Sequence, residues 1–126
     1  MASSNQHIQE QSDGQIVTQA YCEAGEWLGL KREDLADIIG ASVASIARYK
    51  AKTAEINDAK RMELALMLIR IYRSLFAIVG GDKAKMQHWI NTDNRHLNEQ
   101  TPLQLLKSIQ GMYTTVRYLD AMRGRI

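Results

Sequence analysis

The sequence predicts an all-α helical bundle, and three observations support this fold class. A single proline and an aromatic content of 6% disfavour an all-β protein, which needs more turn residues and more aromatic side chains. Apolar residues recur at three- and four-residue spacings along most of the chain, as they do on one face of a helix. With 45% hydrophobic residues in a chain of 126, the bundle has enough apolar side chains for a core.

The residue pattern in the first half of the chain predicts an N-terminal arm followed by a small helical head. Residues 1–14 lack periodic apolar positions and are expected to form a flexible N-terminal arm. Helices are expected over about 16–28, 32–39 and 42–50, with a glycine after each of the first two and a serine placed to cap the third. Residues 15–56 would then form the head.

A long helix is expected over 57–81, from an Asn57 cap to a pair of glycines. Residues 64–79 are apolar on nearly every side, so a single core face does not account for them. We therefore expect this helix to be both the centre of the bundle and a homodimer interface. The apolar residues that motivate the dimer include Leu64, Leu68, Ile71 and Leu75.

Residues 82–126 predict three further helices. An aspartate is placed to cap the first, and a polar loop follows it. Thr101 is placed to cap the second, with Pro102 at the first helical position, where the missing N–H does no harm. Gly111 is expected to end that helix, and the last helix is expected over roughly 113–123.

The stretch 35–49 has the residue pattern of a helix-turn-helix. Apolar residues point inward from both helices, and Gly40 supplies the positive φ of the turn. The residues on or near the outward side, at the end that would enter a major groove, are Ser42, Val43, Ala44, Ser45, Ala47 and Arg48. Lys50 and Lys52 follow and are placed to hold phosphates. The segment resembles the Xre (Cro/repressor-like) helix-turn-helix group, although an ordinary helix hairpin would show a similar pattern.

DNA binding by this segment is expected to be local and to need two heads. The net charge of +2 is too small to make the whole surface a nucleic-acid binder. Arg48 is the one outward side chain that can form two hydrogen bonds with a guanine. A single head is therefore expected to bind operator DNA weakly.

Residues 82–126 carry a second pattern, in which a tryptophan, a polar loop, a Thr-Pro-Leu helix start and spaced apolar residues follow one another. Its members are Trp89, Asn94, Leu97, Thr101, Pro102, Leu103, Leu106, Ser108, Gly111, Val116, Leu119 and Gly124. Their order and spacing resemble the toxin-binding domain of the Xre/MbcA/ParS antitoxin family. Asp93 stands where that family generally has proline and Asn98 where it generally has glycine, and both departures affect the rigidity of the loop.

The resemblance implies an antitoxin with a C-terminal three-helix toxin-binding domain. The implied partner is a RES-domain toxin that consumes NAD, and the complex would repress its own operon through operator DNA. Most apolar members of the pattern are expected in the core. The residues expected to contact the toxin are Asn91, Asn94, Arg117, Asp120, Arg123, Arg125 and Ile126. Gly124 is expected to release the last residues as a short basic tail that reaches into a concave site.

Two other classes of protein remain as alternatives. The first is a stand-alone Xre-like transcriptional regulator whose C-terminal half only dimerises. The second, an enzyme, is disfavoured because His7, His88, His96 and Cys22 have no metal-ligand spacing and no nucleophile stands beside a base. We expect no catalytic residue, metal or cofactor. With one cysteine and no signal-peptide or membrane-span pattern, the protein is expected to be cytoplasmic.

Overall fold

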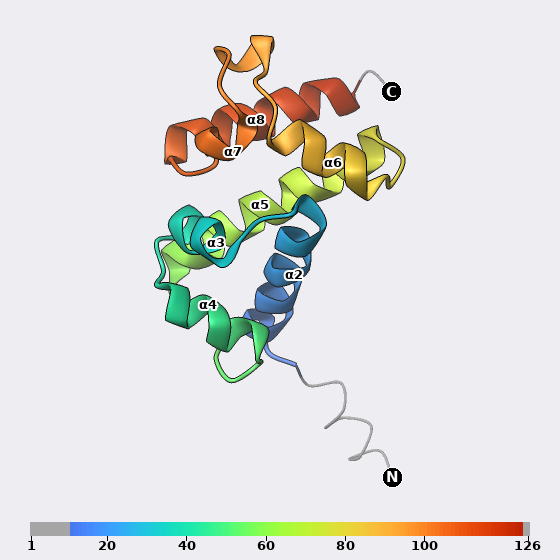
Figure 1. Cartoon of the computed structure of the whole chain (residues 1–126). Coiled ribbons are helices and arrows are strands. Elements are labelled where there is room, and N and C mark those ends of the chain that lie inside the picture. Colours follow the sequence, from blue (N-terminus) through green and yellow to red (C-terminus); the bar gives the residue numbers. More distant parts are fainter. Residues whose placement is uncertain (1–10, 125–126) are drawn as a thin grey trace.

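The computed structural model describes residues 11–124 and confirms the all-α fold (Figure 1). Its helices are α2 (Asp13–Leu28), α3 (Arg32–Ile39), α4 (Val43–Lys50), α5 (Ala59–Ile78), α6 (Lys83–Ile90), α7 (Pro102–Leu105) and α8 (Ile109–Arg123), with a 3-10 turn, η1 (Arg95–Leu97), before α7. Within these residues no helix has the length and apolar character needed to cross a bilayer.

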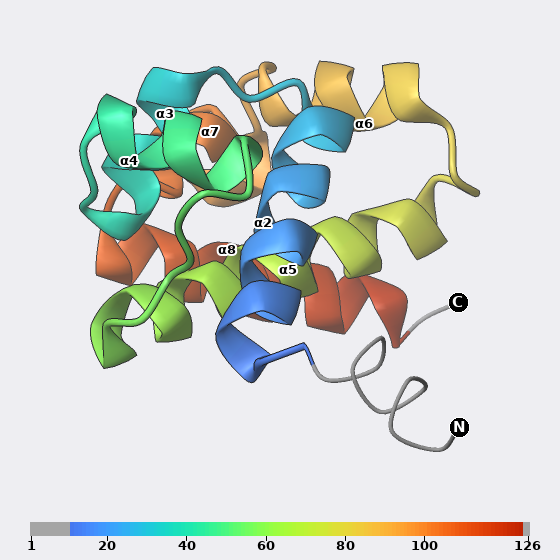
Figure 2. The ribbon, with the colours of Figure 1, turned by 90° about the horizontal axis from the view of Figure 1, so that it is seen from below.

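Helix α5 is the centre of the bundle. In Figure 1, α8 lies above α5, whereas α4 and the start of α2 lie below it. Figure 2, seen from below, shows α2 crossing in front of α5 with α8 behind it. Helices α2 and α8 both pack extensively on α5, so the side chains of α5 contact protein on more than one side. The largest fully buried side chains are Tyr21, Leu28, Leu35, Ile39, Ile46, Ile56, Leu68, Ile71, Leu75, Met86, Ile90 and Leu106.

The four apolar residues that motivated the dimer pack against the core of the single chain, although Leu66 and Phe76 of the same helix are exposed. Leu68, Ile71 and Leu75 are at most 1% exposed in the single chain, and Leu64 is partly buried against the same core. The expectation of a central helix is therefore right, but these residues no longer point to a homodimer. The helix cap also differs from the prediction, because the side chain of Asp58, not that of Asn57, accepts the hydrogen bond from the backbone N–H of Arg61.

Helix α2 begins earlier than predicted, at Asp13, because Ser12 caps it. The Ser12 hydroxyl oxygen accepts from the N–H of Gln15, and the Gln15 side chain accepts from the N–H of Ser12, which completes a capping box. The Ser12 hydroxyl also donates to a Glu55 carboxylate oxygen at 2.6 Å. The predicted arm over 1–14 thus includes the first helical residues, and residues 1–10 lie outside the described part of the chain.

Gly111 lies inside α8 and does not end α7, which corrects the predicted boundary. Helix α7 is only four residues long, and Ser108 caps α8 by accepting from the N–H of Gly111. A Cβ atom at Gly111 would lie 2.1 Å from the carbonyl oxygen of Leu105. The glycine is therefore needed for a close approach of two backbone segments, and α8 starts at Ile109, four residues before the predicted start.

Polar contacts connect the lower helices to the rest of the bundle. The buried Tyr21 hydroxyl of α2 donates to the carbonyl oxygen of Leu35 in α3 at 2.7 Å, and burial raises the pKa of this phenol. Lys107, in the turn before α8, lies 3.0 Å from a carboxylate oxygen of Asp34 and 3.6 Å from one of Asp37, both on α3. Its hydrogen bond to Asp34 raises the pKa of Lys107, so this link stays charged around neutral pH.

Candidate functional site

The α3–α4 pair has a short turn that Gly40 makes conformationally accessible. Gly40 has a φ of +70°, and no atom lies within 4 Å of a Cβ built there, so glycine is favoured by the backbone angle rather than by space. Arg61 of α5 donates to the Gly40 carbonyl oxygen at 3.0 Å. Ile46 and Tyr49 of α4 are buried, whereas the turn itself is exposed. This packing fixes which side of α4 faces outward.

Three predicted DNA-contact residues lie together on the outward side of α4. The Ser42 hydroxyl caps the helix by accepting from the N–H of Ser45, and it donates to the Ser45 hydroxyl oxygen at 3.0 Å. Arg48 donates to the same Ser45 oxygen at 3.1 Å. Val43 and Ala44 are exposed beside them. The guanidinium of Arg48 is therefore held along the helix surface by a serine one turn earlier.

The two lysines lie at the C-terminal end of α4, where the helix closes on a left-handed residue. The N–H of Lys52 donates to the Tyr49 carbonyl, and the N–H of Thr53 donates to the Arg48 carbonyl at 3.0 Å. Lys52 itself has a φ of +64°, which lies in the left-handed region that residues other than glycine and asparagine seldom adopt. Lys50 and Lys52 are both exposed. Together with Arg48 they make this end of the head basic.

The loop over 91–100 uses two predicted toxin-contact residues for its own structure. The Asn91 side chain donates to the Gln87 carbonyl at 2.8 Å, which caps the end of α6. The Asn94 side chain accepts from the N–H of His96 at 2.9 Å, and the Asn94 backbone pairs with Gln100. Asn98 has a φ of +58°, a conformation that glycine and asparagine tolerate best. This explains how asparagine can stand where the family generally has glycine.

A stack of three rings attaches this loop to α8. Tyr118 lies between Trp89 of α6, at 6.4 Å between ring centroids, and His96 of η1, at 5.9 Å, with interplanar angles of 8° and 22°. Trp89 and Tyr118 are partly buried, and His96 is exposed. The sequence placed Trp89 in the core, and in the structure it is partly buried against the core while its ring takes part in this stack. The stack gives the polar loop a fixed position.

The charged residues predicted on α8 have partners within the chain. Asp120 forms an ion pair with Arg70 of α5, and Arg123 donates to the Ser74 hydroxyl at 3.5 Å. Gly124 has φ −66° and ψ −14°, a right-handed conformation and not the left-handed one typical of a glycine that ends a helix. Arg125 and Ile126 lie outside the described residues.

Sequence reasoning missed two apolar residues on the exposed side of α8. Ile109 is 65% exposed and Tyr113 is 54% exposed, although both are large. The guanidinium carbon of Arg117 lies 5.8 Å from the centroid of the Tyr113 ring, and the three residues follow one another at four-residue spacing. That spacing was the signal available in the sequence, but the predicted start of α8 at Tyr113 left Ile109 outside the helix.

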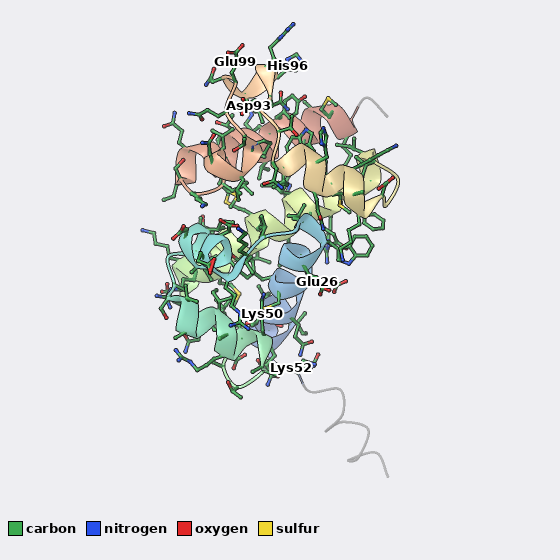
Figure 3. All side chains as sticks on the ribbon, viewed as in Figure 1. Glu26, Lys50, Lys52, Asp93, His96 and Glu99 are labelled. Carbon is green, nitrogen blue, oxygen red and sulfur yellow. The ribbon has the colours of Figure 1, made fainter. Side chains whose placement is uncertain are left out.

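The two sets of candidate residues lie at opposite ends of the molecule. Figure 3 shows Lys50 and Lys52 at the lower end, beside α4, and Asp93, His96 and Glu99 at the top, on the loop above α8.

Over residues 11–124, no three His, Cys, Asp or Glu side chains are grouped so that they could hold a metal ion. Partial burial raises the pKa of the Cys22 thiol, although Lys50 lowers it, and this favours the thiol over the reactive thiolate.

Residues 74–125 match the family model of the antitoxin Xre/MbcA/ParS C-terminal toxin-binding domain. This span contains α6, η1, α7 and α8, together with the end of α5. Residues 74–125 are therefore similar to this toxin-binding domain, and the predicted resemblance of the C-terminal part of the chain to the Xre/MbcA/ParS antitoxin family is confirmed over that span.

Among solved structures, the fold is similar to that of a chain in the crystal structure of the M. tuberculosis MbcT–MbcA toxin–antitoxin complex. The TM-score is 0.68 and the sequence identity is 23%, over 88% of this chain and 96% of that chain. The similarity thus extends over the α2–α5 part as well as the family domain. No curated protein matches the sequence.

Proposed function

We propose that this antitoxin binds and neutralises a RES-domain, NAD-consuming toxin through the α8 face, and that it binds operator DNA through α4 to repress its own operon. The proposal is carried by the match of residues 74–125 to a toxin-binding domain. The basic residues of α4 lie at the opposite end of the molecule from the loop of that domain. Both NAD and operator DNA are cytoplasmic, so the protein would act there.

The α8 face has the chemistry of a protein interface. Tyrosine and arginine are enriched at the energetic centres of interfaces, and Tyr113 with Arg117 supplies both on one exposed stripe. Ile109 adds apolar surface one turn away. Because Arg117 lies over the Tyr113 ring, it is already ordered and loses less side-chain entropy on binding.

The charged residues around this stripe are proposed to form the rim of the interface. Asp120 and Arg123 lie further along α8, and their pairing with Arg70 and Ser74 holds their side chains in place. Arg125 and Ile126 follow them in the sequence and would extend the rim. Asn91 and Asn94 would act mainly by fixing the loop that stands beside this face.

The α3–α4 pair is proposed to be a helix-turn-helix that enters the major groove with α4. Arg48 would contact a guanine, and Ser42 and Ser45 would lie against the backbone or bases beside it. Lys50 and Lys52 would contact phosphates, which supplies affinity without sequence preference. Since one short helix offers one strong base contact, two heads would bind together as a homodimer.

The toxin part is tested by co-expressing the antitoxin with the RES-domain protein from its own operon while cellular NAD is measured. Tyr113→Asp is expected to lose protection, because a carboxylate replaces an aromatic anchor. Thr114→Asp is the matched control, since Thr114 is the next residue of α8, is exposed, and lines a pocket shared with the 95–100 loop instead. Equal protection by both variants would show that the toxin binds elsewhere.

The gene next to this one separates the proposal from the alternative of a stand-alone regulator. An antitoxin of this type is expected to be adjacent to a reading frame for a RES-domain protein. A neighbour of another kind, together with normal NAD in cells that lack this protein, would favour the regulator.

A further inference from the structure

The first two turns of α4 present apolar side chains at the end of the helix that is proposed to enter DNA. Val43 is 42% exposed although it is a large hydrophobic residue. Ala44 is exposed beside it, and Ala47 is partly buried one turn later. None of these three side chains has a hydrogen-bonding atom. We call them the apolar patch of α4.

Helix α4 packs on the core through other residues. Ile46 and Tyr49 are 1% and 6% exposed, and both belong to the hydrophobic core cluster. The exposed part of Val43 is therefore available to a partner without any change in the packing of the head.

The polar side chains next to the apolar patch are already bonded to one another. Ser42 Oγ accepts from the N–H of Ser45 and donates to Ser45 Oγ. The same Ser45 oxygen accepts from a guanidinium N–H of Arg48 at 3.1 Å. Because a hydroxyl oxygen has two acceptor positions, Ser45 has only its own O–H left to offer, whereas Arg48 keeps its other N–H donors. The outward side of α4 therefore offers a base edge mainly one guanidinium group and the apolar patch.

The apolar patch matches one chemical group in the major groove, the C5-methyl group of thymine. A base edge with a donor or an acceptor would lose its water against the patch without gaining a hydrogen bond, which costs free energy. Thymine instead buries its methyl group against an apolar side chain. Cytosine has no such methyl group and presents an amino donor, so the patch favours thymine over cytosine.

We propose that Val43 is a specificity-determining residue of α4 that contacts a thymine methyl group in each operator half-site. The inference rests on the proposed function, because α4 has to enter the major groove. Val43 precedes Arg48 by five residues, which is about 7.5 Å along a helix, and stacked base pairs are about 3.4 Å apart. The thymine is therefore expected about two to three base pairs from the guanine proposed for Arg48.

The test uses the purified full chain and duplexes of the DNA directly upstream of its operon, in which single thymines are replaced by deoxyuridine. The replacement removes the methyl group and leaves the base pairing unchanged. Fluorescence anisotropy is expected to show a thymine at which the replacement weakens wild-type binding about fourfold, equivalent to about 0.8 kcal/mol for one buried methyl group. This thymine should lie about two to three base pairs from the position at which Arg48→Ala relaxes sequence preference.

Three variants assign the effect to Val43. Val43→Ala should bind the thymine and deoxyuridine duplexes with equal affinity, because the contact with the methyl group is lost. Val43→Ile keeps a branched apolar side chain and should retain the ratio of the two affinities. Leu66→Ala is the matched control, because Leu66 is a 50% exposed apolar residue of α5, and its ratio should equal that of the wild type. Circular dichroism verifies that each variant is folded.

The outcomes distinguish this inference from the proposed function. A wild type that binds the upstream duplex no more tightly than a scrambled duplex would overturn both. A wild type that prefers the upstream duplex but has no thymine at which deoxyuridine weakens binding would overturn the inference alone. A Val43→Ala variant with the wild-type ratio would also overturn it, since another residue would then contact the methyl group.

Discussion

The α4 end and the α8 end of this molecule differ in how their surfaces are assembled. The outward residues of the α4 end all come from one short stretch of the sequence, from Ser42 to Lys52, and hydrogen bonds between neighbours one turn apart arrange several of them. The α8 end combines the end of α6, the loop over 91–100, α8 itself and Arg70 of α5. A contiguous surface can be recognised in a sequence, whereas an assembled one depends on the packing of distant segments.

The largest effect is expected at the α8 end, from Gly111→Ala. The added methyl group would meet the Leu105 carbonyl at 2.1 Å, so α7 and α8 would have to separate. We expect a loss of about 3 kcal/mol of unfolding free energy, measured by urea denaturation, at the upper end of the range for overpacking.

Gly124→Ala is the control on the same helix. A Cβ there has no neighbour closer than 3.5 Å, and the residue is in a right-handed helical conformation. The change should leave stability the same or raise it by a few tenths of a kcal/mol. If both alanine variants were equally stable, the close approach of α7 and α8 would not hold the α8 end together.

At the α4 end, substitutions of Arg48 and of the two lysines are expected to change DNA binding in different ways. Arg48→Ala should cost about 1–3 kcal/mol of DNA-binding free energy and relax sequence preference at one base pair. Lys50→Ala should weaken binding to all DNA sequences alike and lower the slope of log affinity against log salt concentration by about one. For Lys52 the cleaner change is Lys52→Gly, because glycine removes the charge and accepts the φ of +64°.

Fluorescence anisotropy with selected and scrambled DNA duplexes at several salt concentrations measures these effects. If all three substitutions weaken every duplex equally, Arg48 contacts a phosphate rather than a base.

A smaller effect is expected from the cap of α4. Ser42→Ala removes the acceptor for the N–H of Ser45 and also one hydrogen bond to the Ser45 hydroxyl. Ser42→Ala should lower the unfolding free energy by about 1 kcal/mol. Ser42→Asp should keep most of the wild-type stability, because aspartate also caps helices. Thermal unfolding of the two variants side by side tests the cap, and an alanine variant as stable as the aspartate variant would contradict it.

Local signals explain which parts of the structure could be predicted. Ser42, Thr101 with Pro102, and Gly40 act through their own backbone neighbours, and each has the expected role. Gly111 has the composition signal of a helix end, but its role depends on Leu105 of the preceding helix, which no local pattern shows. The apolar excess of α5 likewise has two explanations in the sequence, and only the packing of α2 and α8 on it distinguishes them.

The smallest effect is expected in the loop of the α8 end, at Asn98. With a φ of +58°, this position should accept Asn98→Gly with a change of only a few tenths of a kcal/mol, whereas Asn98→Ala should cost about 1 kcal/mol. Chemical denaturation of both variants provides the comparison. An alanine variant as stable as the glycine variant would show that the loop does not require the left-handed conformation.

The claim that the α4 and α8 ends bind separate partners is tested most directly by measuring both affinities for two variants. Calorimetry with the proposed RES-domain toxin and anisotropy with the proposed operator DNA would be applied to Arg48→Ala and Tyr113→Asp. The account predicts that Arg48→Ala weakens DNA binding at least about fivefold and leaves toxin affinity unchanged, and that Tyr113→Asp weakens toxin binding at least about tenfold and leaves DNA affinity unchanged. If either folded variant lost affinity for both partners, the two ends would not be separate sites.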